Sequence, residues 1–248
     1  MKKIIAAIIV AAGITAAFAG TSTNLTAAVA PPKPKWNSSA SLGFTLTRGN
    51  SDTALLALKL QTDRKDSVNE LGFGADGAYG ENDGSENAET LHGFGQWNRL
   101  FTDQFYGYMR VEGLHDGIAD IKYRAMVGPG AGYYLLKETN TTLAVEGGGS
   151  MVFERLGTND SSYATLRLAE RFEHKFAGHG TRVWQRVEIQ PQVDDFNNYI
   201  VNAEVGVEAG IAKNLSLQTY VDDSYANQPA PGRKKNDVKL VSAISCKF

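Results

Sequence analysis

Alternation between apolar and polar residues, with a period of two, runs through most of this chain from residue 36 to its end. In the segment RVWQRVEIQ, Val183 and Val187 fall on one face while Arg186 and Glu188 fall on the other. The same pattern recurs in FYGYMRVEG, in YIVNAEVGVEAG and in the closing KLVSAISCKF. A period of two places successive side chains on opposite faces of a β-strand, so the chain is predicted to be all-β.

Turn signals divide this region into twelve predicted strands. Clusters of Gly, Asn, Asp, Ser and Pro begin near residues 49, 63, 81, 101, 115, 138, 157, 177, 194, 212 and 228, leaving segments of roughly 10 to 15 residues. A strand that crosses a bilayer obliquely needs about 9 to 11 residues, whereas strands of globular proteins have about five or six. An even number of strands also places both ends of the barrel-forming segment on one side of the membrane. We therefore predict a twelve-stranded antiparallel transmembrane β-barrel of the bacterial outer membrane over residues 36–248.

Aromatic residues near the ends of the predicted strands are typical of girdles at the two membrane interfaces. They are Trp36, Trp97, Phe101, Phe105, Tyr133, Tyr134, Phe176, Trp184, Phe196, Tyr220 and Tyr225. The alternative is that they are core residues of a soluble β-protein. Two places depart from the alternation, because Glu170 falls on an apolar face and residues 91–99 are mixed on both faces. A β-bulge or a switch toward the pore would explain them.

The first nineteen residues have the plan of a secretory signal peptide: two lysines, an apolar stretch, and Ala17-Phe18-Ala19 before Gly20. Residues 20–35 contain a Pro/Lys cluster and are predicted to be a flexible leader. Subtracting Lys2 and Lys3 from the 25 basic residues leaves 23 against 27 acidic ones, a net charge of −4. This charge excludes a nucleic-acid-binding surface.

The stretch TLTRGNSDTALL contains a turn whose sequence identifies a family. Gly49, Asn50, Ser51 and Thr53 match a G-N-[ST]-x-[ST] turn between two long strands, and the chain resembles the YdiY-like salt-induced outer-membrane proteins of the domain-of-unknown-function 481 family. The resemblance covers residues 36–248 and implies an outer-membrane barrel linked to salt or acid stress, with no established enzymatic activity and no cofactor. The final strand ends at Phe248 and resembles the signal that the barrel assembly machinery reads. Outer-membrane lipids and that machinery are the partners we expect.

Charged residues on the faces opposite the apolar stripes are the candidate functional residues. They are Lys59, Asp76, Arg110, Glu112, Arg124, Glu146, Arg167, Arg171, Arg186, Glu188, Glu204, Glu208 and Lys239. Exposed to lipid, such charges cost several kcal/mol, so they are predicted to point into the lumen. Their signs alternate between neighbouring strands, with Arg186 and Glu188 expected to face Glu204 and Glu208. This favours pairing across a filled or narrow lumen over a single-sign selectivity ring.

Other motifs suggest enzyme or cofactor chemistry only weakly. GFGADG matches the glycine pattern of a dinucleotide site, but no helix follows, so its glycines are predicted to allow close packing in a strand, as in GPGAG and GGG. Pro129 suggests a β-bulge. The candidate groups for hydrolysis or metal binding are His92, His115, His174, His179, Ser150, Asp160 and Ser162, and no motif joins them. We predict a non-enzymatic envelope protein without metal or cofactor. A small-solute diffusion channel is the alternative, and an outer-membrane hydrolase or adhesin is a weaker one.

Overall fold

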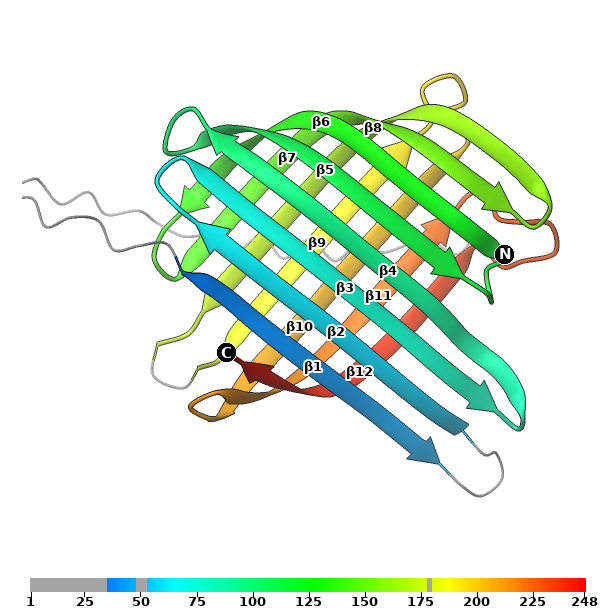
Figure 1. Cartoon of the computed structure of the whole chain (residues 1–248), viewed down its shortest axis with the longest axis horizontal. Coiled ribbons are helices and arrows are strands. Elements are labelled where there is room, and N and C mark those ends of the chain that lie inside the picture. Colours follow the sequence, from blue (N-terminus) through cyan, green and yellow to red (C-terminus); the bar gives the residue numbers. More distant parts are fainter. Residues whose placement is uncertain (1–34, 48–52, 178–179) are drawn as a thin grey trace, which may run out of the picture. The chain divides into compact units, whose positions relative to one another are not determined.

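Twelve antiparallel β-strands close into a barrel in the computed structural model, which describes residues 35–47, 53–177 and 180–248 (Figure 1). The strands are β1 (Trp36–Thr47), β2 (Thr53–Lys65), β3 (Asn69–Asn82), β4 (Ser85–Leu100), β5 (Phe105–Asp116), β6 (Ile121–Lys137), β7 (Thr141–Leu156), β8 (Asn159–Lys175), β9 (Arg182–Pro191), β10 (Tyr199–Ala212), β11 (Leu215–Ala226) and β12 (Asn236–Lys247). The predicted all-β class and the number of strands are confirmed. No described segment forms a helix long and apolar enough to cross a membrane.

Each strand pairs with its neighbours in sequence, and β1 pairs with β12 to close the ring. The strands are inclined, so those at the front of Figure 1 cross those behind them. The closing seam is short, since its register pairs run from Ser39↔Lys247 to Gly43↔Ala243. We call the barrel end that carries Trp36 and Phe248 the terminus rim, and the opposite end the far rim.

The outer face of the barrel is apolar. On β1 and β2, the side chains of Leu42, Phe44, Leu56, Leu58 and Leu60 are 43–65 % exposed, while the residues between them face the lumen. Large exposed apolar side chains continue around the other ten strands. A soluble protein does not expose such a continuous belt, whereas a transmembrane barrel requires one. The predicted transmembrane character follows from this surface.

The two departures from alternation have different physical origins. Glu170 pairs with Val145 and Val187 in an unbroken register, so it lies on the outer face without a bulge and without a switch toward the pore. Its carboxylate accepts a hydrogen bond of 3.2 Å from Gln185. Residues 91–99 look mixed because an apolar ring, Phe94, faces inward while glycines face outward.

Inward-facing glycines make room for aromatic rings on neighbouring strands. A Cβ atom on Gly130 would lie 2.2 Å from Tyr108 Cζ, and one on Gly132 would lie 2.3 Å from Tyr106 Cζ. Pro129, which directly precedes Gly130, does not form the predicted bulge, because the β6–β7 register is the same before and after it. Glycine is required here because any side chain would occupy the space of the rings.

Candidate functional site in the barrel lumen

The twelve charged residues in the predicted lumen set, together with Asp76, lie on the inner face of the barrel. They are Lys59 on β2, Asp76 on β3, Arg110 and Glu112 on β5, Arg124 on β6, Glu146 on β7, Arg167 and Arg171 on β8, Arg186 and Glu188 on β9, Glu204 and Glu208 on β10, and Lys239 on β12. Among the described residues, all of them except Lys239 take part in ion pairs. The lumen is therefore held by charge pairing as well as by packing.

Glu146 is the centre of the largest group of contacts. Its Oε2 atom accepts a bond of 2.8 Å from Arg167 Nη1, and its Oε1 atom accepts one of 2.6 Å from Arg171 Nη2. Tyr106 and Gln96 donate to Oε1 at 2.8 and 2.9 Å. The Glu146 side chain is fully buried. A buried carboxylate is tolerable only when it is paired and hydrogen-bonded, and four donors meet that requirement here.

One ion pair crosses the lumen. Lys59 Nζ on β2 lies 2.5 Å from Glu204 Oε2 on β10, four strands away around the ring. Trp184 Nε1 donates to the other carboxylate oxygen at 2.6 Å, and Lys59 also lies over the Tyr220 ring, 4.6 Å from its centroid. The two rings belong to an apolar cluster that includes Val241 of β12. Side chains from strands that are not neighbours thus meet inside the barrel.

Further carboxylates are paired along the inner wall. Arg182 and Ser216 donate to Glu208 at 3.0 and 2.7 Å, and Lys247 also pairs with it. Arg124 Nε donates to Glu154 at 2.6 Å.

Another such group joins three strands. The His92 ring nitrogens lie 2.9 Å from Asp76 Oδ1 and 3.1 Å from Glu112 Oε1. Arg110 donates to Glu112 at 2.6 Å. These contacts together link β3, β4 and β5.

The predicted alternation of sign between strands is wrong in one cross-strand row. In this row Arg171 lies opposite Arg186, Arg186 opposite Glu204, Glu204 opposite Asp222, and Asp222 opposite Lys239. Two basic residues are therefore neighbours, and so are two acidic ones. The sequence pattern indicates which face a residue occupies, but the register between strands decides which charge it meets.

The predicted facing of β9 and β10 is correct at one of its two positions. Arg186 lies opposite Glu204, but Glu188 lies opposite Asn202, and Glu208 lies opposite Arg182. The reason is that β9 and β10 are antiparallel, so residue numbers that rise on one strand fall on the other.

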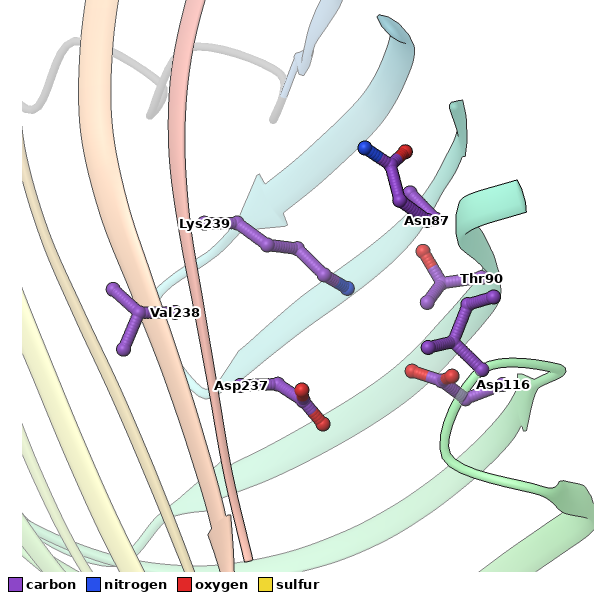
Figure 2. A pocket seen from close by; sticks show the side chains of 8 residues that line it. Asn87, Thr90, Asp116, Asp237, Val238 and Lys239 are labelled. Carbon is purple, nitrogen blue, oxygen red and sulfur yellow. The ribbon is translucent and has the colours of Figure 1, made fainter. Parts of the chain in front are cut away.

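A small cavity lies between two walls near the far rim (Figure 2). It is lined by Asn87, Ala88, Thr90, Asp116, Ile118, Asp237, Val238 and Lys239. In Figure 2, Asp237 and Lys239 reach from β12 toward Thr90 and Asp116. Its volume of about 80 Å³ is well below the roughly 300 Å³ at which pockets for organic ligands begin. It has room for water or an ion, not for an organic substrate.

The candidate hydrolytic groups are not brought together. Ser150 faces the lumen, whereas Asp160 lies near the far rim in an exposed ion pair with Arg155. Ser162 is exposed on the outer side of β8. Among the described residues, no three His, Cys, Asp or Glu side chains are placed to hold a metal ion, while His179 lies outside them. Within the part of the chain that the structure describes, no Ser–His hydrogen bond supplies a nucleophile with its base.

The remaining histidines have local partners. His92 belongs to the lumen network, and His115 Nδ1 lies 2.9 Å from the Lys122 carbonyl oxygen. His174 Nδ1 lies 2.9 Å from Thr141 Oγ1. These contacts fix ring orientation without assembling a reactive centre.

The family turn motif falls mostly outside the described residues. Gly49, Asn50 and Ser51 are not among them, and Thr53 is the first residue of β2. Phe248 lies at the terminus rim with a 76 % exposed side chain, and its backbone exchanges hydrogen bonds of 3.0 and 3.2 Å with Ser38.

Sequence reasoning missed several residues of the lumen network. Glu154, Arg182 and His92 hold ion pairs there but were not among the candidate lumen charges. Parity along the strand could have identified two of them, since Glu154 shares the even numbering of Glu146, and Arg182 that of Arg186. Tyr106 could not be identified as a donor to Glu146, because β5 and β7 are not neighbouring strands.

Comparison with known proteins places the chain in a family. The profile of the family described as "Protein of unknown function, DUF481" matches residues 40–246. The chain belongs to this family. The predicted domain-of-unknown-function 481 membership is thereby confirmed. No curated protein matches the sequence.

Solved structures with a similar course of the chain include outer-membrane barrels. The NanC porin has 7 % identity and a TM-score of 0.49, covering 86 % of this chain and 99 % of that one. The KdgM porin has 9 % identity and a TM-score of 0.46, with 86 % and 99 % covered. The translocator domain of the autotransporter NalP from Neisseria meningitidis has 11 % identity and a TM-score of 0.45, with 87 % and 88 % covered.

Proposed function

We propose that this DUF481 member is an integral, non-enzymatic protein of the bacterial outer membrane whose lumen is kept narrow by its own ion pairs. The observation that carries the proposal is the Lys59–Glu204 pair, which joins two strands four apart around the ring at 2.5 Å. The buried contacts of Glu146 fill the adjoining part of the lumen. Twelve-stranded barrels lie between the filled eight-stranded ones and the open porins, so side chains decide whether a pore remains.

The link to salt or acid stress is part of the same proposal and rests on the resemblance of the 49–53 turn to the YdiY-like proteins. Export by residues 1–19 and assembly through the Phe248 strand complete it. Growth of a deletion strain at high salt and at low pH tests the stress role. Equal growth with and without the gene under both conditions would contradict it.

Single-channel recording in planar lipid bilayers tests the narrow lumen. The refolded chain is expected to give currents far below those of open porins. Conductance of nanosiemens size would overturn the proposal. Slower migration of boiled than of unboiled protein on detergent gels provides the control that the sample is a folded barrel.

A second function, a narrow diffusion channel for small solutes, is favoured by one observation. The side chains of Arg171 and Arg186 are 38 % and 40 % exposed although both point into the barrel. Solvent therefore reaches part of the lumen. A small but ion-selective conductance would support this second function.

A further inference from the structure

The two exposed arginines of the lumen form an unusual pair. Arg171 on β8 and Arg186 on β9 lie directly opposite each other in the strand register. Like charges at directly opposed positions repel and destabilise a sheet. The arrangement is stable only if other groups compensate both charges, so the carboxylates around them must be examined.

The nearby carboxylates are already occupied. Glu146 accepts four hydrogen bonds, of which Arg171 supplies only one. Glu204 is bonded to Lys59 and Trp184, and Arg186 Nη1 approaches it only to 3.5 Å. Each carboxylate is therefore shared with other donors, and neither serves the arginine pair alone.

The ion pairs around the two arginines contain more cations than carboxylates. They join seven cations to five carboxylates. The cations are Lys59, Arg167, Arg171, Lys175, Arg182, Arg186 and Lys247, and the carboxylates are Glu146, Glu173, Glu188, Glu204 and Glu208. Two of these cations, Lys175 and Lys247, are more than half exposed, so the remaining five cations and five carboxylates balance in number, and Arg171 and Arg186 share their carboxylates with other cations.

Several hydrogen-bond donors of the pair are also unused. A guanidinium carries five N–H donors in a planar fork. Arg171 Nε is buried without a hydrogen-bond partner, and the one carboxylate contact of Arg186 among the described residues is the 3.5 Å approach to Glu204. A buried donor without an acceptor is costly, so it indicates that an acceptor belongs there.

Open space lies across the lumen from these donors. Gly72 is on β3, which is six strands from β9 and hence on the opposite wall. A Cβ atom built on Gly72 would meet no atom within 4 Å. Together with the exposure of the two arginines, this leaves room for a small ligand.

We propose that Arg171 and Arg186 form a lumen site for a small oxyanion of the phosphate or sulfate type. Such an anion places negative charge between the two apposed guanidinium groups and accepts hydrogen bonds from both guanidinium forks, which match tetrahedral oxyanions well. The inference rests on the proposed narrow but solvent-reached lumen and names the ligand class of that site.

Calorimetric titration of the folded full-length barrel in detergent with sodium phosphate, and separately with sodium sulfate, tests the proposal. Saturable binding is expected, and Arg186→Gln should weaken it by about tenfold or more. Arg186 is chosen because its one long ion pair makes the variant tolerable for folding. Lys239→Gln is the matched control, since it removes a lumen cation outside these ion pairs, and it should leave affinity unchanged. No saturable heat up to about 10 mM anion, or equal binding by Arg186→Gln, would overturn the proposal.

A second measurement keeps the test independent of variant folding. Phenylglyoxal modifies accessible arginines, and peptide mass spectrometry locates the modified residue. Phosphate should protect Arg171 and Arg186 in the unaltered chain, while the exposed Arg155 on the outer face remains unprotected. Equal modification with and without phosphate would contradict the site. A large conductance would instead refute the narrow lumen, and the binding result would still be interpretable by itself.

Discussion

Replacing Lys59 with Met is the sharpest perturbation of the ion pair that crosses the lumen. Both partners are largely buried, with side-chain exposures of 12 % for Lys59 and 15 % for Glu204. Removing one partner of a buried pair costs about 3 to 5 kcal/mol, because the other charge is left uncompensated. The loss here should be smaller, since Glu204 keeps Trp184 at 2.6 Å and Arg186 at 3.5 Å.

We therefore expect Lys59→Met to lower the free energy of unfolding by about 2 to 3 kcal/mol, including the lost contact with the Tyr220 ring. Urea unfolding of the barrel in lipid vesicles, followed by tryptophan fluorescence, measures this change. The double variant Lys59→Met/Glu204→Gln should lose less than the sum of the two single variants, because no uncompensated charge remains. Its single-channel conductance should also exceed that of the unaltered chain.

The matched control is the exposed Arg155–Asp160 pair on the outer surface. Arg155→Met should leave the unfolding midpoint almost unchanged, because solvent screens exposed pairs. A loss below about 1 kcal/mol for Lys59→Met would mean that its ion pair behaves like an exposed one. That result would refute the reasoning that the middle of the lumen is closed to water by side chains.

Four further substitutions have expected outcomes in the same urea assay. Gly130→Val should lower the free energy of unfolding by about 1 to 3 kcal/mol, because its Cβ would lie 2.2 Å from Tyr108 Cζ. Gly72→Ala has open space around it and should leave the free energy of unfolding unchanged. Equal losses in the two variants would contradict the packing argument. Glu170→Leu should stabilise the barrel in vesicles by about 1 kcal/mol, since it removes a carboxyl group from the lipid-facing surface, and a destabilised variant would show that the hydrogen bond from Gln185 outweighs that cost. Two backbone amides in the same turn donate to the Asp66 carboxylate and hold its pKa below 3.8. The stability that this carboxylate contributes is therefore present above about pH 4 and is lost as pH falls through the lower folded-state pKa. Asp66→Ala should therefore be less stable than the unaltered chain at neutral pH and equal to it in strong acid, and a difference that persists in acid would contradict this.

Alternation along single strands made much of the barrel predictable from sequence. It indicates which residues face lipid, as for Leu56 and Leu58, and which face inward, as for Arg110 and Glu112. The reason is that side-chain direction in a strand depends only on parity and needs no knowledge of its neighbours. Strand length and turn residues are equally local, so the number of strands was predictable as well.

Contacts between strands were not predictable, because they depend on register and on closure of the ring. Lys59 and Glu204 are 145 residues apart and lie on strands that are not neighbours, so no local pattern pairs them. The packing of the Tyr108 ring against Gly130 likewise depends on the register between β5 and β6, which local sequence does not determine. The apposition of Arg171 and Arg186, which carries the proposed anion site, belongs to the same class.

The short seam between β1 and β12 has a consequence for how the barrel opens and closes. Its register pairs have the greatest sequence separation in the ring and end at Gly43↔Ala243 among the described residues. Pairs so distant in sequence form late in folding, because chain entropy opposes them. Backbone amides along this seam should exchange with deuterium sooner than those of the longer β6–β7 ladder. The first and last strands would then be where an unzipping barrel first offers a free strand edge to another chain.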